Sequence, residues 1–478
     1  MFNKLLFRVV TLVFCTYSLA SWANNKPNVL LIVVDDLGWS DVGYNNPKGV
    51  FNTPNINALA ENGAVFTDAY AGAANCAPSR AVLMSGQFTP RHGIYTVSPS
   101  TRGHKKTRKI IPEPNTKFLR ENITTMAEMF KKNKYTTGHF GKWHLGDDPK
   151  TQGFDHNVAG NKKGHPSTYF SPYNLPFISD GPTGEYLTNR ITTEAIDWMK
   201  SVKKAPFFAY IPYYTVHTPL QAIASIKAKY IGQPGIRNEK HATYAAMVEI
   251  MDNNIGRILK SLKDMGIDEN TLVVFTSDNG GIRSISYQDP LRAGKGSYYE
   301  GGTRVPLIVS WPKKIAPDTY DYPVINADFY PTFANTIKAK PDNHLLDGVD
   351  LSSLLYQQKE LPERTLFWHF PIYLQDYNSQ ADQSRDPLFR TRPGSTMRKG
   401  KWKLHHYFED NAFELYDLDN DLGEHVNLAS YLPETLATLK QELNEWRKRT
   451  NAPVPSELNS DYDAKFEADF LKKKLKFQ

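Results

Sequence analysis

The chain has 478 residues, of which 40% are hydrophobic, 12% aromatic and 22% charged, and its formal net charge is +7. This ordinary composition, without a solenoid-length repeat or a long low-complexity tract, excludes repeat proteins and disordered chains and leaves room for one large domain and a smaller one. The mildly basic balance suits an anionic substrate.

The first residues have the pattern of a secretory signal peptide. Lys4 and Arg8 precede an apolar run over residues 9–19, and the small residues Ser21 and Ala23 occupy the two positions that a signal peptidase reads. The apolar run is too short to span a bilayer. The alternative, a buried N-terminal helix, is disfavoured by the polar linker that follows. We predict that residues 1–23 are cleaved and that the protein is exported, either to the periplasm or as a secreted protein, with no membrane anchor.

One cysteine would remain after this cleavage. Cys15 lies inside the predicted signal, and Phe14 before it is not the small residue that a lipoprotein signal needs, so no lipid anchor is expected. Cys76 is then a lone thiol that cannot form an internal disulfide. Such a cysteine in an exported protein indicates a reactive or modified residue, although a small buried thiol is the commoner role of a lone cysteine.

Strands and helices alternate from residue 28 onward. The run over residues 29–34 is continuously apolar and rich in β-branched residues, which is typical of a strand buried on both faces of a parallel sheet. Thr125 and Glu128 predict a capping box that opens a helix. Further strands are predicted over residues 65–69, 206–211 and 272–275, and further helices over 54–63 and 242–265. This alternation predicts an α/β fold built on a doubly wound sheet.

The pattern changes after about residue 350. Residues 397–404 and 413–418 are typical of antiparallel strands, and a last helix is predicted after Pro433. The polar segment 373–393, which carries several arginines, is predicted to be a functional loop. We therefore predict a catalytic domain over residues 24–350 and a smaller α+β subdomain over 351–478 that contributes to the substrate pocket.

Oxygen-bearing side chains follow two of the buried strands. Asp35 and Asp36 close the first strand, and Asp278 and Asn279 close the strand over residues 272–275. Ligands of open α/β sheets bind beyond the carboxyl ends of the strands, and several carboxylates together need a cation. Either pair alone would be interpreted as a turn. Both pairs after buried strands favour a calcium site.

Cys76 is predicted to lie at the start of a helix. Pro78 and Ser79 are good first-turn residues, and Gly86 would end the helix. The free backbone N–H groups of a helix start favour an anion, and Arg80 lies one turn further on the same side.

The segment Cys76-Ala77-Pro78-Ser79-Arg80 closely resembles the signature of type I sulfatases, in which the cysteine is converted to formylglycine. Four further elements resemble that family in order and spacing: residues 135–144, residues 216–219, residues 294–296 together with 300–306, and the positions of Asp35, Asp36, Asp278 and Asn279. The resemblance runs from about residue 26 to the C-terminus and implies an alkaline-phosphatase-like fold. One departure is Ser85 before Gly86, where the family usually has threonine.

The resemblance also implies the roles of the site residues. Asp35, Asp36, Asp278 and Asn279, together with the modified residue Cys76, would hold one calcium ion. The hydrated aldehyde made from Cys76 by a formylglycine-generating maturase would attack sulfur, with Asp278 as proton acceptor and Arg80 as orienting group. Lys142 and Lys295 would hold sulfate oxygens, His217 would protonate the leaving oxygen, with Lys295 as a possible helper, and His144 would act as the base that releases sulfate.

The predicted substrate is a sulfated polysaccharide such as an algal galactan, ulvan or glycosaminoglycan, and no nucleic acid is expected to bind. The basic tract over residues 104–109 and the arginines of the loop over residues 373–393 favour a sulfated polysaccharide as the substrate. Individual substrate contacts are predicted at His165, His369, Arg390 and Arg392. Two alternatives stay open: a phosphonate or phosphate-ester hydrolase of the same superfamily, and a non-catalytic polyanion-binding protein.

Overall fold

A computed structural model describes residues 26–339 and 345–476 of the chain. The predicted signal peptide, residues 1–23, lies outside the described residues. Within the described ranges, no helix has the length and apolar character needed to cross a bilayer.

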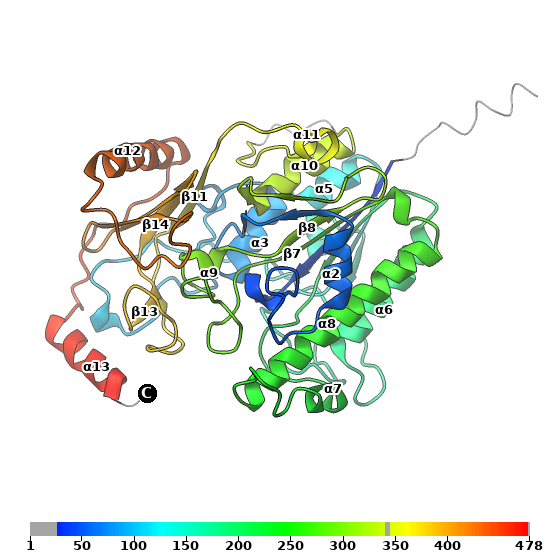
Figure 1. Cartoon of the computed structure of the whole chain (residues 1–478), viewed down its shortest axis with the longest axis horizontal. Coiled ribbons are helices and arrows are strands. Elements are labelled where there is room, and N and C mark those ends of the chain that lie inside the picture. Colours follow the sequence, from blue (N-terminus) through cyan, green and yellow to red (C-terminus); the bar gives the residue numbers. More distant parts are fainter. Residues whose placement is uncertain (1–25, 340–344, 477–478) are drawn as a thin grey trace, which may run out of the picture.

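A mixed eight-stranded sheet forms the middle layer of the larger part of the molecule (Figure 1). Its strand order is β5-β4-β6-β1-β7-β8-β2-β9, with β1 parallel to both neighbours and β8 antiparallel to β7 and β2. All seven residues of β1 are buried, which confirms the strand predicted from its continuous apolar run. The strands are β1 Asn28–Val34, β2 Ala64–Phe66, β4 Thr136–Phe140, β5 His156–Val158, β6 Phe207–Pro212, β7 Thr271–Ser277, β8 Leu307–Ser310 and β9 Asp318–Tyr320.

Helices cover both faces of this sheet (Figure 1), as a doubly wound fold requires. One face carries α2 Pro54–Glu61, α6 Leu187–Val202 and α8 Glu239–Asp264, and the other carries α3 Cys76–Ser85, α5 Met126–Lys132, α10 Phe329–Thr336 and α11 Ser352–Gln357. The predicted capping box of α5 is present, because Thr125 and Glu128 exchange hydrogen bonds. Shorter elements are α4 Thr89–His92, α7 Ala224–Ala228, α9 Glu300–Thr303, β3 Ala69–Tyr70 and β10 Val324–Ile325.

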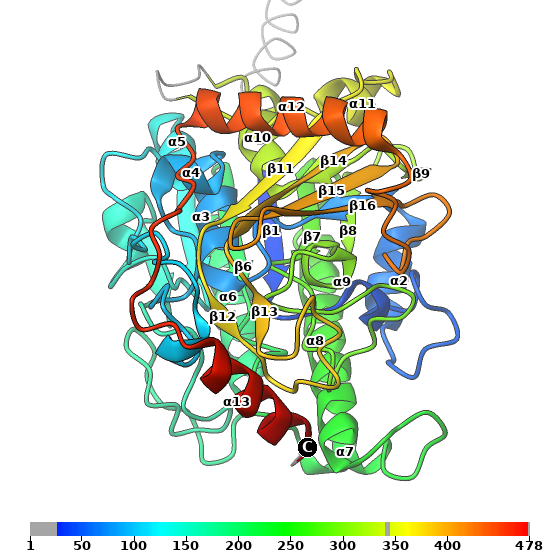
Figure 2. The same cartoon turned by 90° about the vertical axis from the view of Figure 1, so that its left-hand side faces the viewer.

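The C-terminal part is a four-stranded antiparallel sheet in the order β11-β14-β15-β16. The long helix α12 lies across this sheet (Figure 2), and Leu439, Leu443 and Trp446 of α12 join the apolar core beneath it. The elements are β11 Thr365–Phe370, β12 Leu374–Gln375, β13 Phe389–Thr391, β14 Gly394–Lys399, β15 Trp402–Tyr407, β16 Ala412–Asp417, α12 Pro433–Thr450 and α13 Ala464–Lys476.

Three sequence-based predictions need correction. The run over residues 397–404 is two strands, because the chain turns back at Gly400, whose φ of 51° suits a tight turn. The strand predicted over residues 65–69 splits into the short strands β2 and β3, which pair in different sheets. Helix α12 is not the last helix, because α13 follows it.

Buried charges connect α9 to the C-terminal sheet. The Nζ of Lys403 on β15 lies 2.7 Å from Glu300 and 3.2 Å from Glu424, and all three side chains are fully buried. Burial raises the pKa of Glu424 to about 7, and the charge of Glu300 adds to this, while Lys403 opposes it. Removal of one member of such a cluster leaves the others without a partner.

We therefore expect Lys403→Met to destabilise the protein by about 3 kcal/mol, measured as a shift of the urea unfolding midpoint. The matched control is Lys401→Met, because Lys401 also pairs with a carboxylate, 2.7 Å away on Asp417, but its side chain is 40% exposed. An exposed pair contributes at most about 1 kcal/mol. Equal shifts for the two variants would contradict a stabilising role for the buried cluster.

Candidate active site

The predicted ligand residues meet where β1 and β7 end side by side. Two hydrogen bonds connect Asp36 to the residues that follow β7. The backbone N–H of Asp36 donates to Asp278 Oδ1 at 3.2 Å, and Asn279 Nδ2 donates to Asp36 Oδ1 at 2.9 Å. Asp36 has a φ of 63°, a left-handed conformation that side-chain-bearing residues rarely adopt and that concentrates at functional sites. The parallel pairing of β1 with β7 thus brings the two acidic sequence pairs together.

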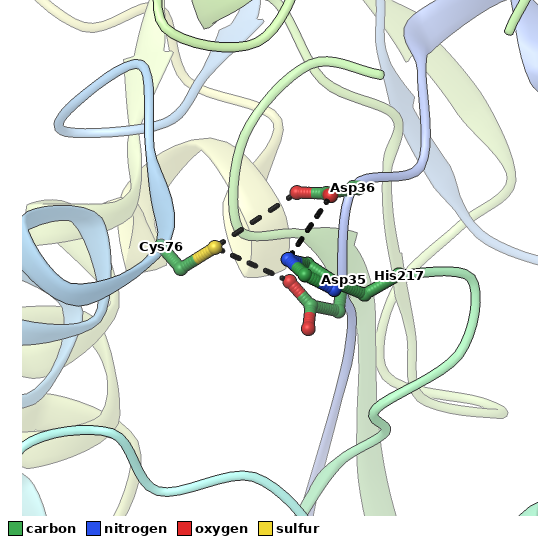
Figure 3. A group of neighbouring side chains, drawn as sticks. All are labelled: Asp35, Asp36, Cys76 and His217. Carbon is green, nitrogen blue, oxygen red and sulfur yellow. Dashed lines mark hydrogen bonds and ion pairs between the residues drawn. The ribbon is translucent and has the colours of Figure 1, made fainter. Parts of the chain in front are cut away.

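Cys76 faces these carboxylates from the first residue of α3 (Figure 3). Its Sγ lies 3.4 Å from Asp35 Oδ1 and 3.8 Å from Asp36 Oδ1, and Lys295 Nζ approaches it at 3.3 Å. Burial raises the pKa of the thiol to about 12, although Lys142 and Lys295 oppose this shift. The thiol therefore stays protonated at neutral pH and is a poor nucleophile.

Three buried cations face the three carboxylates. Lys142 Nζ donates to Asp35 at 2.7 Å, Lys295 Nζ donates to Asp36 at 2.7 Å, and Arg80 Nε donates to Asp278 at 2.9 Å. Arg80 also donates to the backbone carbonyl of Lys142 at 2.9 Å, so it fixes two site residues at once. The formal charges of these six groups cancel, and an added divalent cation would make the site net positive, which suits an anionic substrate.

The residues fit a divalent cation of the calcium type. One ligand atom from each of Asp35, Asp36, Cys76 and His217 lies within 4.8 Å of the others. Asn279 Oδ1 is buried and has no hydrogen-bond partner among the described residues, as expected for an oxygen that binds a cation. Burial raises the pKa of Asp35 to about 7, and its acidic neighbours add to this while Lys142 opposes it. A bound cation would relieve that repulsion.

Two histidines face the same region. The φ of His144 is 64°, and its pKa lies well below the usual range because of burial and the charge of Lys142. His217 Nδ1 lies 2.8 Å from the carbonyl oxygen of Thr218, to which it donates, and this leaves Nε2 directed at Asp36 Oδ2 at 3.6 Å. Burial and Lys295 hold the pKa of His217 well below its usual range. Both rings are thus neutral in the resting site.

A cavity of about 310 Å³ opens beside Cys76. It is lined by Asn75, Cys76, Val97, Arg102, His144, Gly164, His165, His217, Lys295, Leu374, Tyr377 and Arg390. The structure therefore brings two predicted substrate contacts, His165 and Arg390, to the same cavity as the predicted catalytic groups. The ring of His165 stacks on that of His217 with centroids 5.8 Å apart.

The other two predicted substrate contacts, His369 and Arg392, need correction. His369 is 1% exposed, and its ring nitrogens bind Ser395 Oγ and the carbonyl oxygen of Pro453. Arg392 forms ion pairs with three carboxylates, those of Asp386, Glu409 and Glu467. Neither side chain lines the cavity, and each is already fully engaged within the protein.

The basic tract over residues 104–109 is also engaged within the protein. Lys105 and Lys106 pair with Asp461 and Asp463, and His104 stacks on Phe466 of α13. The acidic segment before α13 thus engages part of this tract through exposed ion pairs, and the use of the tract as a substrate surface stays a prediction. The cavity residues that sequence reasoning missed include Arg102, just before the tract, and Tyr377.

The fold and this site together define a hydrolase that acts on anionic esters. The family profile named Sulfatase matches residues 27–339, and a second, named N-sulphoglucosamine sulphohydrolase, C-terminal, matches residues 294–449. A curated sulfatase of Formosa agariphila is 34% identical, with 90% of each chain covered, and human arylsulfatase A is 30% identical, covering 87% of this chain and 86% of the relative. The crystal structure of Ps i-CgsB in complex with k-i-k-neocarrahexaose is 30% identical with a TM-score of 0.74, covering 95% of this chain and 98% of that one.

The chain belongs to the sulfatase family, and it is a sulfuric ester hydrolase. The similarity to solved sulfatases also confirms the predicted alkaline-phosphatase-like α/β fold with an antiparallel C-terminal sheet.

Proposed function

We propose that the chain hydrolyses sulfate esters of a sulfated polysaccharide or of its oligosaccharides, with formylglycine at Cys76 and calcium beside it. The observation that carries the proposal is the position of Cys76 at the start of α3, with Sγ facing Asp35, Asp36 and Lys295. A thiol kept protonated by burial is a poor nucleophile, which favours an oxidised working form. The neocarrahexaose bound to a relative supports a carbohydrate substrate.

Formylglycine would form in a two-electron oxidation carried out by a separate maturase, with dioxygen or another two-electron acceptor of the maturase as the oxidant. The Cβ–S bond of Cys76 would be replaced by a carbonyl, with oxygen entering from water or the oxidant and sulfur leaving as sulfide. We further propose that the protein is exported to the periplasm or the medium, directed by residues 1–23.

Asp35, Asp36, Asp278 and Asn279 would hold the calcium ion together with the modified Cys76. When bound, the ion would supply positive charge beside the sulfate and raise the acidity of the attacking hydroxyl. The remaining steps belong to the side chains around it.

Lys142 and Lys295 would bind sulfate oxygens; what supports this is that both ammonium groups reach the carboxylates that flank Cys76. Asp278, oriented by Arg80, is the proposed proton acceptor. His144, which is neutral in the resting site, is the proposed base that later releases sulfate.

His217 is the proposed acid for the leaving oxygen. It is neutral in the resting site, but an anionic sulfate bound beside it would favour the imidazolium form. We therefore expect proton uptake to accompany substrate binding. Lys295 stands next to the same position and would assist.

The test of this function is peptide mass spectrometry joined to an assay. Co-expression with a formylglycine-generating maturase should lower the mass of the Cys76 peptide by about 18 Da, the change from thiol to aldehyde, and yield a protein that releases sulfate from sulfated saccharides. A fully matured protein that releases no sulfate from any of them would overturn the proposed substrate class. Full activity with an unmodified thiol would overturn formylglycine.

His217→Gln is expected to lower kcat on a sugar sulfate about a hundredfold but on a nitrophenyl sulfate less than about tenfold, because a weakly basic phenolate leaves without a proton. The two kcat values are compared in the same matured preparation. His156→Gln, which replaces a histidine of β5 outside the cavity, is the matched control and should change neither. Equal losses on both substrates would show that His217 is not the acid.

A further inference from the structure

Two arginines of the cavity form no ion pair with an acidic residue in the part of the chain that the structure describes. Arg102 is half-buried and makes no hydrogen bond or ion pair with any residue that the structure describes. Arg390 is 5% exposed, and its guanidinium donates to neutral acceptors, the carbonyl oxygens of Gln375 and Lys295, each at 2.9 Å. The contrast with Arg392 on the same segment is clear, because Arg392 pairs with three carboxylates.

Asp382, an acidic residue whose pKa is raised by burial while the charge of Arg390 opposes this shift, already has other hydrogen-bond partners. The carboxylate of Asp382 accepts the backbone N–H groups of Tyr377 and Asn378 and forms no ion pair with Arg390 within the described ranges. Arg102 and Arg390 act on each other instead, and burial together with the charge of Arg390 lowers the pKa of Arg102. Two like charges held together in this way are stabilised when an anion binds between them.

Both arginines line the cavity beside Cys76, and Arg390 is held in place there by several contacts. The backbone carbonyl of Lys295 binds Arg390, while the Nζ of the same lysine contacts Cys76 Sγ. The guanidinium of Arg390 also stacks on Tyr377, with Cζ 3.3 Å from the ring centroid, and Tyr377 is 47% exposed at the cavity mouth. A substrate whose sulfate lies on Cys76 would therefore extend toward Arg102, Arg390 and the Tyr377 ring.

We propose that Arg102 and Arg390 form a second anion subsite, which binds another oxyanion on the saccharide that carries the hydrolysed sulfate. This inference rests on the proposed function and narrows it: the preferred substrate is a saccharide with at least two anionic groups close together. The second group is a sulfate ester or a uronate carboxylate, since a guanidinium binds both in the same bidentate way. Arg392 is already paired with three carboxylates, so Arg102 and Arg390 are the arginines that the cavity offers to a second anion.

The test compares three disaccharides in the matured enzyme: one with a single sulfate, one with two sulfates, and one with a sulfate and a carboxylate. The wild type should give a higher kcat/KM for at least one doubly anionic disaccharide. Arg102→Gln should lower that preference about tenfold to a hundredfold, the effect of losing a charge-assisted contact, chiefly through KM. Arg102→Lys, which keeps the charge, should retain part of it. The disaccharide whose preference falls identifies the second group as sulfate or carboxylate.

Arg385→Gln is the matched control. It removes the same charge from the loop over residues 373–393, but Arg385 pairs with Asp410 and lies outside the cavity, so the preference should stay unchanged. An unchanged preference in Arg102→Gln, with sulfate still released, would overturn the subsite and leave the proposed function standing.

Binding to the unmodified thiol form separates the two proposals, because it needs no turnover. Calorimetry should show that Arg102→Gln weakens the doubly anionic disaccharide and leaves the singly sulfated one nearly unaffected. If the matured wild type releases no sulfate while this difference in binding persists, the subsite stands and the proposed function fails. If Arg102→Gln weakens both ligands equally, the subsite is refuted.

Discussion

Cys76→Ala is expected to lower the release of sulfate by about ten-thousandfold or more, because it removes the atom from which the nucleophile is made. The protein should still fold, since Cys76 is 2% exposed and alanine fits the space without a new polar group. The loss should appear in kcat, while the lysines at the site still bind the sulfate group. The measurement is kcat and KM for a sulfated saccharide with matured wild type and variant.

A matched control comes from the same helix. Met84 near the end of α3 is fully buried, and Met84→Leu conserves its volume, so a cost below about 1.5 kcal/mol and unchanged turnover are expected. Thermal unfolding of both variants separates loss of the nucleophile from loss of the fold. Turnover by Cys76→Ala within tenfold of the wild type would show that another group attacks the ester.

The strands that carry the site could be predicted because their continuous apolar sequences fit only one structural environment. A continuous apolar run such as β1 has one sensible environment, a strand buried on both faces, and Asp35 and Asp36 then have to lie at its carboxyl end. The helix that begins at Cys76 could be predicted for a similar reason, since Gly86 ends it in a left-handed conformation with a φ of 66°.

The substrate contacts could not be predicted in the same way, because a charged side chain can serve a ligand or a neighbour. Arg390 and Arg392 are two residues apart, yet one binds carbonyl groups beside the cavity and the other binds three carboxylates. Their difference depends on Glu409 and Glu467, which are distant in sequence. Only the three-dimensional structure shows which carboxylates form ion pairs with which arginines.

The basic tract over residues 104–109 is a second case in which the sequence did not reveal the ion-pair partners of charged side chains. Two of its lysines, Lys105 and Lys106, pair with Asp461 and Asp463, which lie in the segment that leads into α13. Because α13 was not predicted, the sequence did not identify the ion-pair partners of the tract, and its charge was interpreted as free to bind a substrate. Arg102, which does line the cavity, stood beside this tract without any local pattern to distinguish it.

Lys295→Met is expected to lower kcat/KM for a sulfate ester about a thousandfold, the effect of removing one preorganised charge from a water-poor site. Lys295 is 6% exposed, and its Nζ contacts both Asp36 at 2.7 Å and Cys76 at 3.3 Å. Gly296 beside it has a φ of 87°, so the backbone that presents this ammonium group suits glycine and little else. Lys295→Arg should not restore the rate, because a planar guanidinium cannot replace a compact ammonium in this space.

Lys162→Met is the matched control for this loss, since Lys162 lies close in sequence to the cavity residue Gly164 but is exposed. It pairs with Asp147 at 2.8 Å, and the two side chains are 59% and 72% exposed, so screening leaves the pair little energy. Its kcat/KM should stay within about twofold of the wild type, as for surface charges that do not touch substrate. If Lys295→Met behaves like this control while remaining folded, Lys142 and the bound cation alone stabilise the charge on sulfate, and Lys295 serves only to neutralise Asp36.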